Sequence, residues 1–267
     1  MKIGICTSCQ EVAALKSIPF DYLEEHVQRF LVPEEPQESF EENWRNARSL
    51  SLPIETANCL LPATLPLVAT TSRQVDGPRL ARYIQTALRR AEQVGIRLFV
   101  FGSGDARACP AAHSREDAVQ QIGDHLARWS GWAKEHGVQI VLEPLRFEET
   151  NLLNTVAESG ALVERVALSG AKLLVDTYHM ACNGESPTDI LQWSTLLAHV
   201  HVAEKKDRAA PGRYGEDLRS YFAPLHQGGY DQRISIECNW QDFAGEVALA
   251  VATVREQWNA SGAESPR

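Results

Sequence analysis

The sequence has no long hydrophobic run and no cluster of basic residues. No segment approaches the roughly 18 consecutive apolar residues that a membrane-spanning helix needs. Residues 1–6 are too few and are followed by polar residues too soon to form the apolar part of a signal peptide. The net charge of -9 argues against surfaces for nucleic acid or anionic membrane, which need clustered positive charge. We therefore expect a cytoplasmic protein that binds neither.

The sequence also lacks a disulfide framework and any linker. Its six cysteines are dispersed over 267 residues, and the lone Cys6-Thr-Ser-Cys9 pair has no second pair at zinc-binding spacing. No segment rich in proline, or in glycine and serine, divides the chain. The sequence therefore predicts one domain with reduced thiols, over residues 1–259, followed by a flexible tail over residues 260–267.

Short apolar runs alternate along the chain with longer amphipathic segments. This alternation is typical of βα units around a parallel sheet, and the length is close to the about 250 residues of one eight-stranded barrel. We predict an α/β fold, a single (β/α)8 TIM barrel. Its eight strands are predicted at Lys2–Cys6, Phe20–Glu25, Pro53–Cys59, Arg97–Phe101, Val138–Glu143, Lys172–Asp176, Ala198–Ala203 and Arg233–Glu237.

Two helices have clear boundary signals. One follows Pro78 with apolar residues at helical spacing and ends at Gly95, and the other begins at Ser114 and ends at Gly137. Further helices are predicted from weaker patterns over 37–51, 154–168, 188–196, 214–227 and 242–258, and a short one between the first two strands.

Three of the predicted strands end in a carboxylate: Glu143, Asp176 and Glu237. The seventh strand places His199 and His201 on one face, because side chains alternate along a strand. The carboxyl ends of the strands of a barrel meet at one face, where barrel enzymes build their active sites. We therefore expect these side chains to lie close together.

Each of these residues also has a structural interpretation, since an Asp can cap the next helix and a histidine can be a hydrogen-bonded core residue. As a set they favour a metal, because converging carboxylates repel one another unless a cation lies between them. Oxygen ligands with one imidazole suit a divalent ion such as Mn²⁺, our first choice, or Mg²⁺ or Co²⁺.

The same strand ends carry a family resemblance. The chain resembles the xylose isomerase-like barrel superfamily of sugar and sugar-phosphate isomerases and epimerases, which includes the ketose 3-epimerases. The motifs that carry it are Glu143-Pro-Leu with Glu149-Thr-Asn, Val175-Asp-Thr-Tyr-His-Met, His199-Val-His-Val-Ala-Glu with Asp207-Arg208, and Ser235-Ile-Glu237. The resemblance implies metal ligands at Glu143, Asp176, His201 and Glu237, and substrate contacts at Glu149, His179 and Arg208.

Three assignments of residues to the substrate pocket either have an alternative or depend only on where the residue lies in the sequence. The family commonly has Asn-Arg where this chain has Arg146-Phe147, so Glu148 is an alternative to Glu149. Trp240 follows Glu237 and is a candidate to line the substrate pocket. The segment from Phe101 to Arg107, with Gly-Ser-Gly, could bind a phosphate, or could be a tight loop that lets a substrate lie close to the backbone.

The predicted metal site suits proton abstraction next to a carbonyl, with Glu143 and Glu237 as the two proton carriers on either side of an enediolate. This gives a carbohydrate epimerase, or an aldose–ketose isomerase if one carboxylate serves both carbons. A dehydratase of keto-polyols, of the inosose type, is the nearest alternative. A three-zinc DNA-repair phosphodiesterase is disfavoured by the acidic charge.

A barrel can also keep a cleft and lose turnover, so a non-catalytic sugar- or metal-binding subunit is the alternative of another class. The partners that we expect are a sugar or polyol substrate and, from the resemblance, a second copy of this chain in a homo-oligomer.

Overall fold

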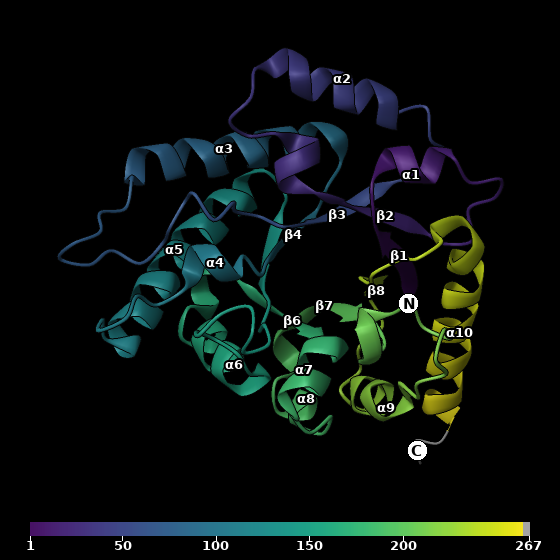
Figure 1. The fold of residues 1–267 in the computed structure, drawn as a ribbon. Coiled ribbons are helices and arrows are strands. Elements are labelled where there is room, and N and C mark those ends of the chain that lie inside the picture. Colours follow the sequence, from purple (N-terminus) through teal and green to yellow (C-terminus); the bar gives the residue numbers. More distant parts are fainter. Residues whose placement is uncertain (264–267) are drawn as a thin grey trace.

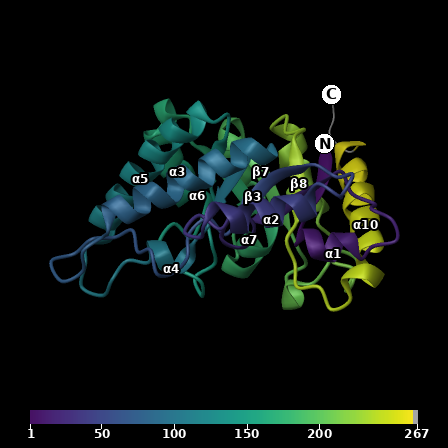
Figure 2. The ribbon, with the colours of Figure 1, turned by 90° about the horizontal axis from the view of Figure 1, so that it is seen from above.

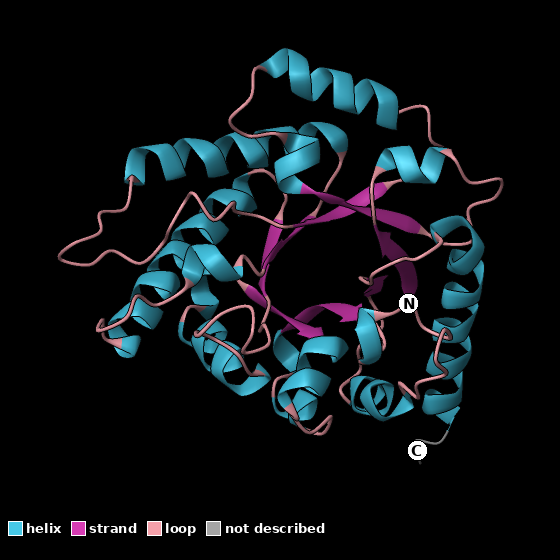
Figure 3. Ribbon diagram, viewed as in Figure 1, coloured by secondary structure: helices cyan, strands magenta, loops and turns pink. Residues whose placement is uncertain are grey.

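Eight parallel strands form a closed barrel in sequence order, in a computed structural model that describes residues 1–263 (Figures 1 and 3). Strand β1 pairs with β8 and closes the ring. The strands are β1 (Lys2–Cys6), β2 (Tyr22–His26), β3 (Ile54–Asn58), β4 (Leu98–Phe101), β5 (Gln139–Leu142), β6 (Lys172–Asp176), β7 (Leu197–Val202) and β8 (Arg233–Ile236). The predicted fold and all eight predicted strands are confirmed.

Helices surround the barrel (Figure 1). The longer ones are α2 (Gln37–Ala47), α3 (Gly77–Val94), α5 (Arg115–Glu135), α6 (Val156–Arg165), α9 (Arg219–Gln227) and α10 (Phe243–Ala263). Short ones are α1 (Cys9–Ala13), α4 (Gly104–Arg107), α7 (Thr177–Asn183) and α8 (Asp189–Gln192), with a π-helical turn η1 (Val27–Leu31) and 3-10 turns η2 (Ala167–Ser169), η3 (Ser194–Leu196) and η4 (Lys206–Arg208). Among the described residues, no helix is both long and apolar enough to cross a membrane.

Side chains cap the start of both helices that have clear boundary signals in the sequence. The side chain of Asp76 accepts a hydrogen bond from the backbone of Arg79 at the start of α3, and Gly95 ends that helix with φ 90°. The hydroxyl of Ser114 accepts a bond from the N–H of Asp117 at the start of α5. These bonds satisfy backbone groups that a helix end leaves without partners.

Several helix boundaries differ from the prediction. Helix α2 ends at Ala47 instead of 51, and α6 covers Val156–Arg165 instead of 154–168. Helix α9 begins at Arg219 instead of 214, because the buried carboxylate of Glu204 accepts backbone N–H bonds from residues 212, 214, 215 and 216 and holds this segment as a loop. Helix α10 continues to Ala263, so residues 260–263 are helical and do not form the start of a loose tail. Residues 264–267 of the predicted tail lie outside the described residues.

The interior of the barrel divides into an apolar and a polar half. Phe101 packs edge-on against Trp129 of α5 and so faces the helices, and alternation then places Leu98 and Val100 of β4 inside the barrel. These two belong to a separate buried apolar cluster with Val141, Leu174 and Ala198. The other half is filled by buried polar side chains from β2, β3, β7 and β8, namely Tyr22, Glu24, Thr56, His199, His201 and Ser235.

The two ends of the barrel are distinct. Figure 2 shows the barrel from the side, with the N-terminus, where β1 begins, at one end and α4, which follows β4, at the other. Because all strands run in the same direction, the loops that leave them gather at the end marked by α4. This is the end at which a catalytic site is expected.

Candidate metal centre and substrate pocket

Four side chains converge at the carboxyl ends of β5 to β8. Glu143 follows β5 directly, Asp176 is the last residue of β6, His201 lies in β7 and Glu237 follows β8 directly. One ligand atom from each lies within 4.8 Å of those of the other three. The structure therefore brings together the four residues that the sequence selected, and it does so at the predicted end of the barrel.

The imidazole of His201 bridges the cluster and the barrel interior. Its Nδ1 lies 3.1 Å from Oε1 of Glu143 and 3.2 Å from Oε2 of Glu237. Its Nε2 lies 2.8 Å from Oε1 of Glu24, on the opposite side of the ring. Nδ1 thus faces Glu143 and Glu237 and could bind an ion, while Nε2 faces Glu24.

The donor set fits a divalent cation. Three carboxylates and one imidazole supply four ligands of the oxygen and nitrogen type, without a thiolate among them. Asp176 can cap a helix with one oxygen and bind an ion with the other. Its Oδ1 caps α7 by accepting from the backbone of Tyr178 at 2.7 Å, while Oδ2 faces Arg208 at 3.4 Å within the cluster.

The neighbours of Glu143 and Glu237 separate their pKa values. Burial raises the pKa of Glu143, the hydrogen bond from His201 opposes this rise, and the negative charge of Glu237 adds to it. Burial acts in the same direction at Glu237, but Arg208 and His201 outweigh it and hold that pKa well below its usual value. Two carboxyls with opposed pKa shifts are suited to exchange of a proton at the same site.

A cavity of about 230 Å³ opens above the cluster. It is lined by Glu143 and Glu237 and by three residues that the resemblance assigns to the substrate, Glu149, His179 and Arg208. Glu148, the alternative to Glu149, is exposed and is not part of the lining. The geometry therefore favours Glu149 for a substrate contact.

Arg208 reaches the cluster from a constrained turn. Its guanidinium pairs with Glu237, lies 3.4 Å from Asp176 and stacks 4.8 Å above the ring of Tyr178. Asp207 and Arg208 both have positive φ, 59° and 50°, which is costly for residues other than glycine. The ion pairs with Glu237 and Asp176 hold this cationic group at the edge of the cavity.

Two candidate residues are placed differently from the prediction. Trp240 packs against Phe243, with ring centroids 5.1 Å apart, and is not among the residues that line the cavity. Arg107 is fully buried, and its guanidinium donates to the backbone carbonyl of Glu143 at 2.8 Å instead of facing a phosphate. The cause is the short helix α4, which turns Arg107 toward the protein interior.

The Gly-Ser-Gly segment does lie close to the cluster. A Cβ at Gly102 would be 2.4 Å from Oε2 of Glu143, closer than carbon and oxygen can approach. Because residue 102 is a glycine, the carboxylate of Glu143 has room at this position. Of the two interpretations of the segment, the structure supports the tight loop, because the guanidinium of Arg107 is turned toward backbone carbonyls in the interior.

Replacing Gly102 by Ala is expected to weaken divalent-metal binding by about 10-fold or more, because Glu143 must move to make room. Isothermal titration with Mn²⁺ measures this change. Gly131→Ala in α5 is the matched control, since nothing lies within 4 Å of a Cβ there and its metal affinity should not change. An unchanged affinity in folded Gly102→Ala protein would contradict the role given to Glu143.

The sequence did not indicate two residues of the site. Asn58, at the end of β3, donates from Nδ2 to Oε1 of Glu237 at 2.7 Å, and Glu24 accepts from His201. Asn58 ends a strand and could have been selected by the same rule as the carboxylates. Glu24 could not, because it sits beside Glu25 in β2 and only the register decides which of the two enters the barrel.

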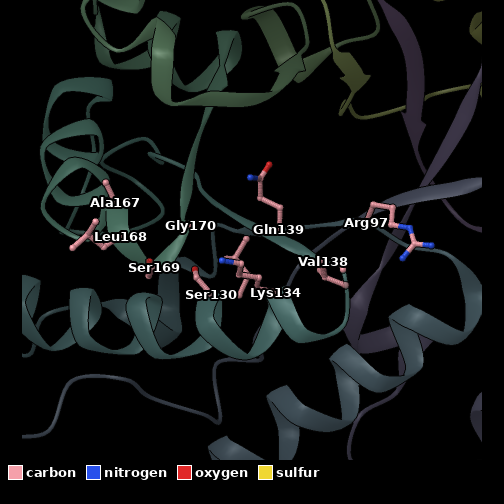
Figure 4. A pocket seen from close by; sticks show the side chains of 11 residues that line it. Arg97, Ser130, Lys134, Val138, Gln139, Ala167, Leu168, Ser169 and Gly170 are labelled. Carbon is pink, nitrogen blue, oxygen red and sulfur yellow. The ribbon is translucent and has the colours of Figure 1, made fainter.

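A larger cavity of about 440 Å³ lies elsewhere, where β5 begins, between α5 and η2 (Figure 4). Its lining includes Arg97, Ser130, Lys134 and Gln139. None of the described residues that line it is an acid or a histidine. It therefore offers neither a carboxylate nor an imidazole for a metal, and the smaller cavity is the candidate active site.

Comparisons with known proteins agree with this architecture. A family model described as xylose isomerase-like TIM barrel matches residues 12–259. L-ribulose 3-epimerase from Methylomonas sp. (strain DH-1) is 29% identical over 206 residues, which are 73% of this chain and 68% of the relative.

Solved structures show the same fold. A structure of L-ribulose 3-epimerase superposes with a TM-score of 0.79 at 21% identity, over 97% of this chain and 95% of the other. The 3-keto-D-glucoside 4-epimerase from E. coli gives a TM-score of 0.75 at 22% identity, over 96% and 99% of the two chains.

Proposed function

The chain belongs to the xylose isomerase-like TIM barrel family, and we propose that it is a divalent-metal-dependent epimerase of ketose sugars, free or phosphorylated. The observation that carries the proposal is the pair Glu143 and Glu237. The two carboxylates follow different strands, lie 3.1 and 3.2 Å from Nδ1 of His201 and line the same cavity. A carbon held between them would be within reach of a base on each side.

The four ligands would be Glu143, Asp176, His201 and Glu237. A divalent ion bound there would hold the carbonyl and a neighbouring hydroxyl of the sugar and so acidify the intervening C–H bond. The protein keeps the two bases in place. Asn58 donates to one oxygen of Glu237 and Arg208 pairs with the other, which fixes the plane of that carboxylate.

One carboxylate would remove the proton from the substrate carbon, and the other would return a proton to the opposite face. The inverted centre is then the product, and an enediolate connects the two steps. If one carboxylate serves both carbons, the product is instead an isomer with the carbonyl moved. Glu149, His179 and Arg208 line the cavity with a carboxylate, an imidazole and a guanidinium, which suit the hydroxyl groups of a sugar.

Incubation with a panel of ketoses and keto-polyols in D₂O, with Mn²⁺, tests the proposal. We expect an epimer that carries one deuterium at the inverted carbon, because the returning proton comes from solvent. Loss of water from the product would favour the dehydratase, and a moved carbonyl would favour the isomerase. Absence of both conversion and exchange with every substrate would favour a non-catalytic barrel.

Three further assignments belong to the proposal. Mn²⁺ is the proposed ion, with Mg²⁺ and Co²⁺ as alternatives, because the ligand set is rich in carboxylate oxygens. We also propose a homo-oligomer, from the family resemblance. A cytoplasmic location is also proposed, and the net charge of -9 argues against a nucleic-acid or anionic-membrane partner.

A further inference from the structure

A network of buried hydrogen bonds lies directly beneath the metal centre, inside the barrel. Its centre is Glu24 of β2, a carboxylate that is 1% exposed. Oε1 of Glu24 lies 2.8 Å from Nε2 of His201. Oε2 accepts from the hydroxyl of Thr56 at 2.7 Å and of Ser235 at 2.6 Å, and lies 2.7 Å from Nε2 of His199.

The two oxygens of Glu24 therefore have different tasks. Three donors from β3, β7 and β8 hold Oε2, so the carboxylate cannot rotate without breaking several buried bonds. Among residues 1–263, the hydrogen-bond partner of Oε1 is the imidazole of His201. The positions of these three strands thus fix Oε1 of Glu24 as a hydrogen-bond acceptor next to Nε2 of His201, the proposed metal ligand.

We infer that Glu24 is a positioning residue that keeps Nε2 of His201 protonated and Nδ1 free to bind the metal. The inference deepens the proposed function and rests on it, because His201 is taken as a metal ligand. A carboxylate that accepts the second N–H of a ligating histidine fixes the tautomer and the ring plane and makes the other nitrogen a better donor to the ion.

His199 is a supporting member of this network. Its Nε2 is engaged with Glu24, and its ring meets that of His201 edge-on with centroids 5.0 Å apart. It does not belong to the cluster of four ligand atoms above. The paired histidines of β7 thus have separate tasks: His201 faces the ion, and His199 holds the carboxylate that orients His201.

Glu25 provides a matched control. It is the neighbouring residue, is 2% exposed and accepts backbone bonds from Cys9 at 2.7 Å and from His26 at 2.9 Å. Alternation along β2 directs its side chain toward α1, away from the barrel interior. Glu25→Gln therefore makes the same chemical change at a buried site that does not touch His201.

Titration of Co²⁺ into the metal-free protein, followed by its visible absorption, measures the effect. We expect Glu24→Gln to bind Co²⁺ about 10- to 100-fold more weakly with an altered spectrum, and Glu25→Gln to match the wild type. Ser235→Ala removes one donor to Oε2 and should give a smaller loss. If Glu24→Gln fails to fold, Ser235→Ala and Glu24→Asp carry the test.

Nitrogen NMR of the Mg²⁺-loaded wild-type protein tests the tautomer without any variant. We expect the proton of His201 on Nε2. A proton on Nδ1 would overturn the inference and, with it, metal coordination through Nδ1. Co²⁺ affinity and spectrum in folded Glu24→Gln that match the wild type would overturn the inference and leave the proposed function intact. A wild-type protein that binds no Co²⁺ would instead remove the proposed metal site itself.

Discussion

Glu237→Gln is expected to lower kcat for epimerisation by about 10²- to 10⁴-fold, the range that a positioned general acid or base contributes. Gln keeps an oxygen for the metal and for Asn58, whose Nδ2 donates to Oε1 of the native carboxylate. It removes the ability to carry a proton, together with one negative charge and the oxygen that pairs with Arg208, so kcat is compared at saturating Mn²⁺. KM should change much less than kcat, because Glu149, His179 and Arg208 still line the cavity.

Isotope exchange sharpens this prediction. With two bases on opposite faces, Glu237→Gln should still exchange the carbon-bound hydrogen of one epimer with D₂O, through Glu143, while failing to invert it. Glu143→Gln should exchange the carbon-bound hydrogen of the other epimer, through Glu237, and should also fail to invert it. Glu148→Gln, which changes an exposed carboxylate outside the cavity, should keep full activity. A Glu237→Gln protein with unchanged activity and metal content would refute its assignment as a proton carrier.

Removal of the metal with a chelator is the second large effect expected. Activity should be lost and should return when Mn²⁺, Mg²⁺ or Co²⁺ is added. The melting temperature should fall by several degrees, because an ion at 100 times its Kd stabilises the folded state by about 2.7 kcal/mol. Without it, Glu143, Asp176 and Glu237 repel one another at the barrel mouth.

Asp176→Asn provides the control for metal removal. It preserves the shape of the side chain and an oxygen that can accept the bond from Tyr178 at the start of α7. It removes one of the three negative charges that attract the ion. The variant should therefore melt at a temperature that depends less on added metal. Full activity in the presence of excess chelator would contradict the metal-dependent mechanism.

The sequence was sufficient to find the barrel and the three converging carboxylates because both depend on position along a strand, whereas the choice of His201 over His199 came from the family resemblance. Buried parallel strands are nearly continuous apolar runs, so a carboxylate at the end of such a run is conspicuous. Glu143 and Asp176 stand at these ends. Parallel strands in a closed barrel then bring distant positions to one face, whatever the loops between them do.

The side-chain network beneath the cluster could not be predicted in the same way. Glu24 and Glu25 are neighbours with the same side chain, and their opposite directions depend on how β2 pairs with β3. That pairing has an irregularity between Leu23 and Glu24. A shift of one residue would exchange the two faces, and no local pattern encodes it.

The residues in loops were the least predictable. Trp240 is next to the site in sequence, but packing against Phe243 decides where its ring lies. Arg107 was a candidate cation for a phosphate, yet the turn into α4 directs it to backbone carbonyls in the interior. A loop side chain follows the tertiary contacts available to it, and these are not visible in the spacing of the sequence.

The central claim is that one divalent ion binds between Glu143, Asp176, His201 and Glu237. A crystal structure of the Mn²⁺-loaded protein, with anomalous scattering recorded at the manganese edge, tests it most directly. The account predicts one strong peak, about 2.0–2.4 Å from Nδ1 of His201 and from an oxygen of each carboxylate. A peak at any other place, coordination through Nε2 of His201, or the absence of a peak would contradict it.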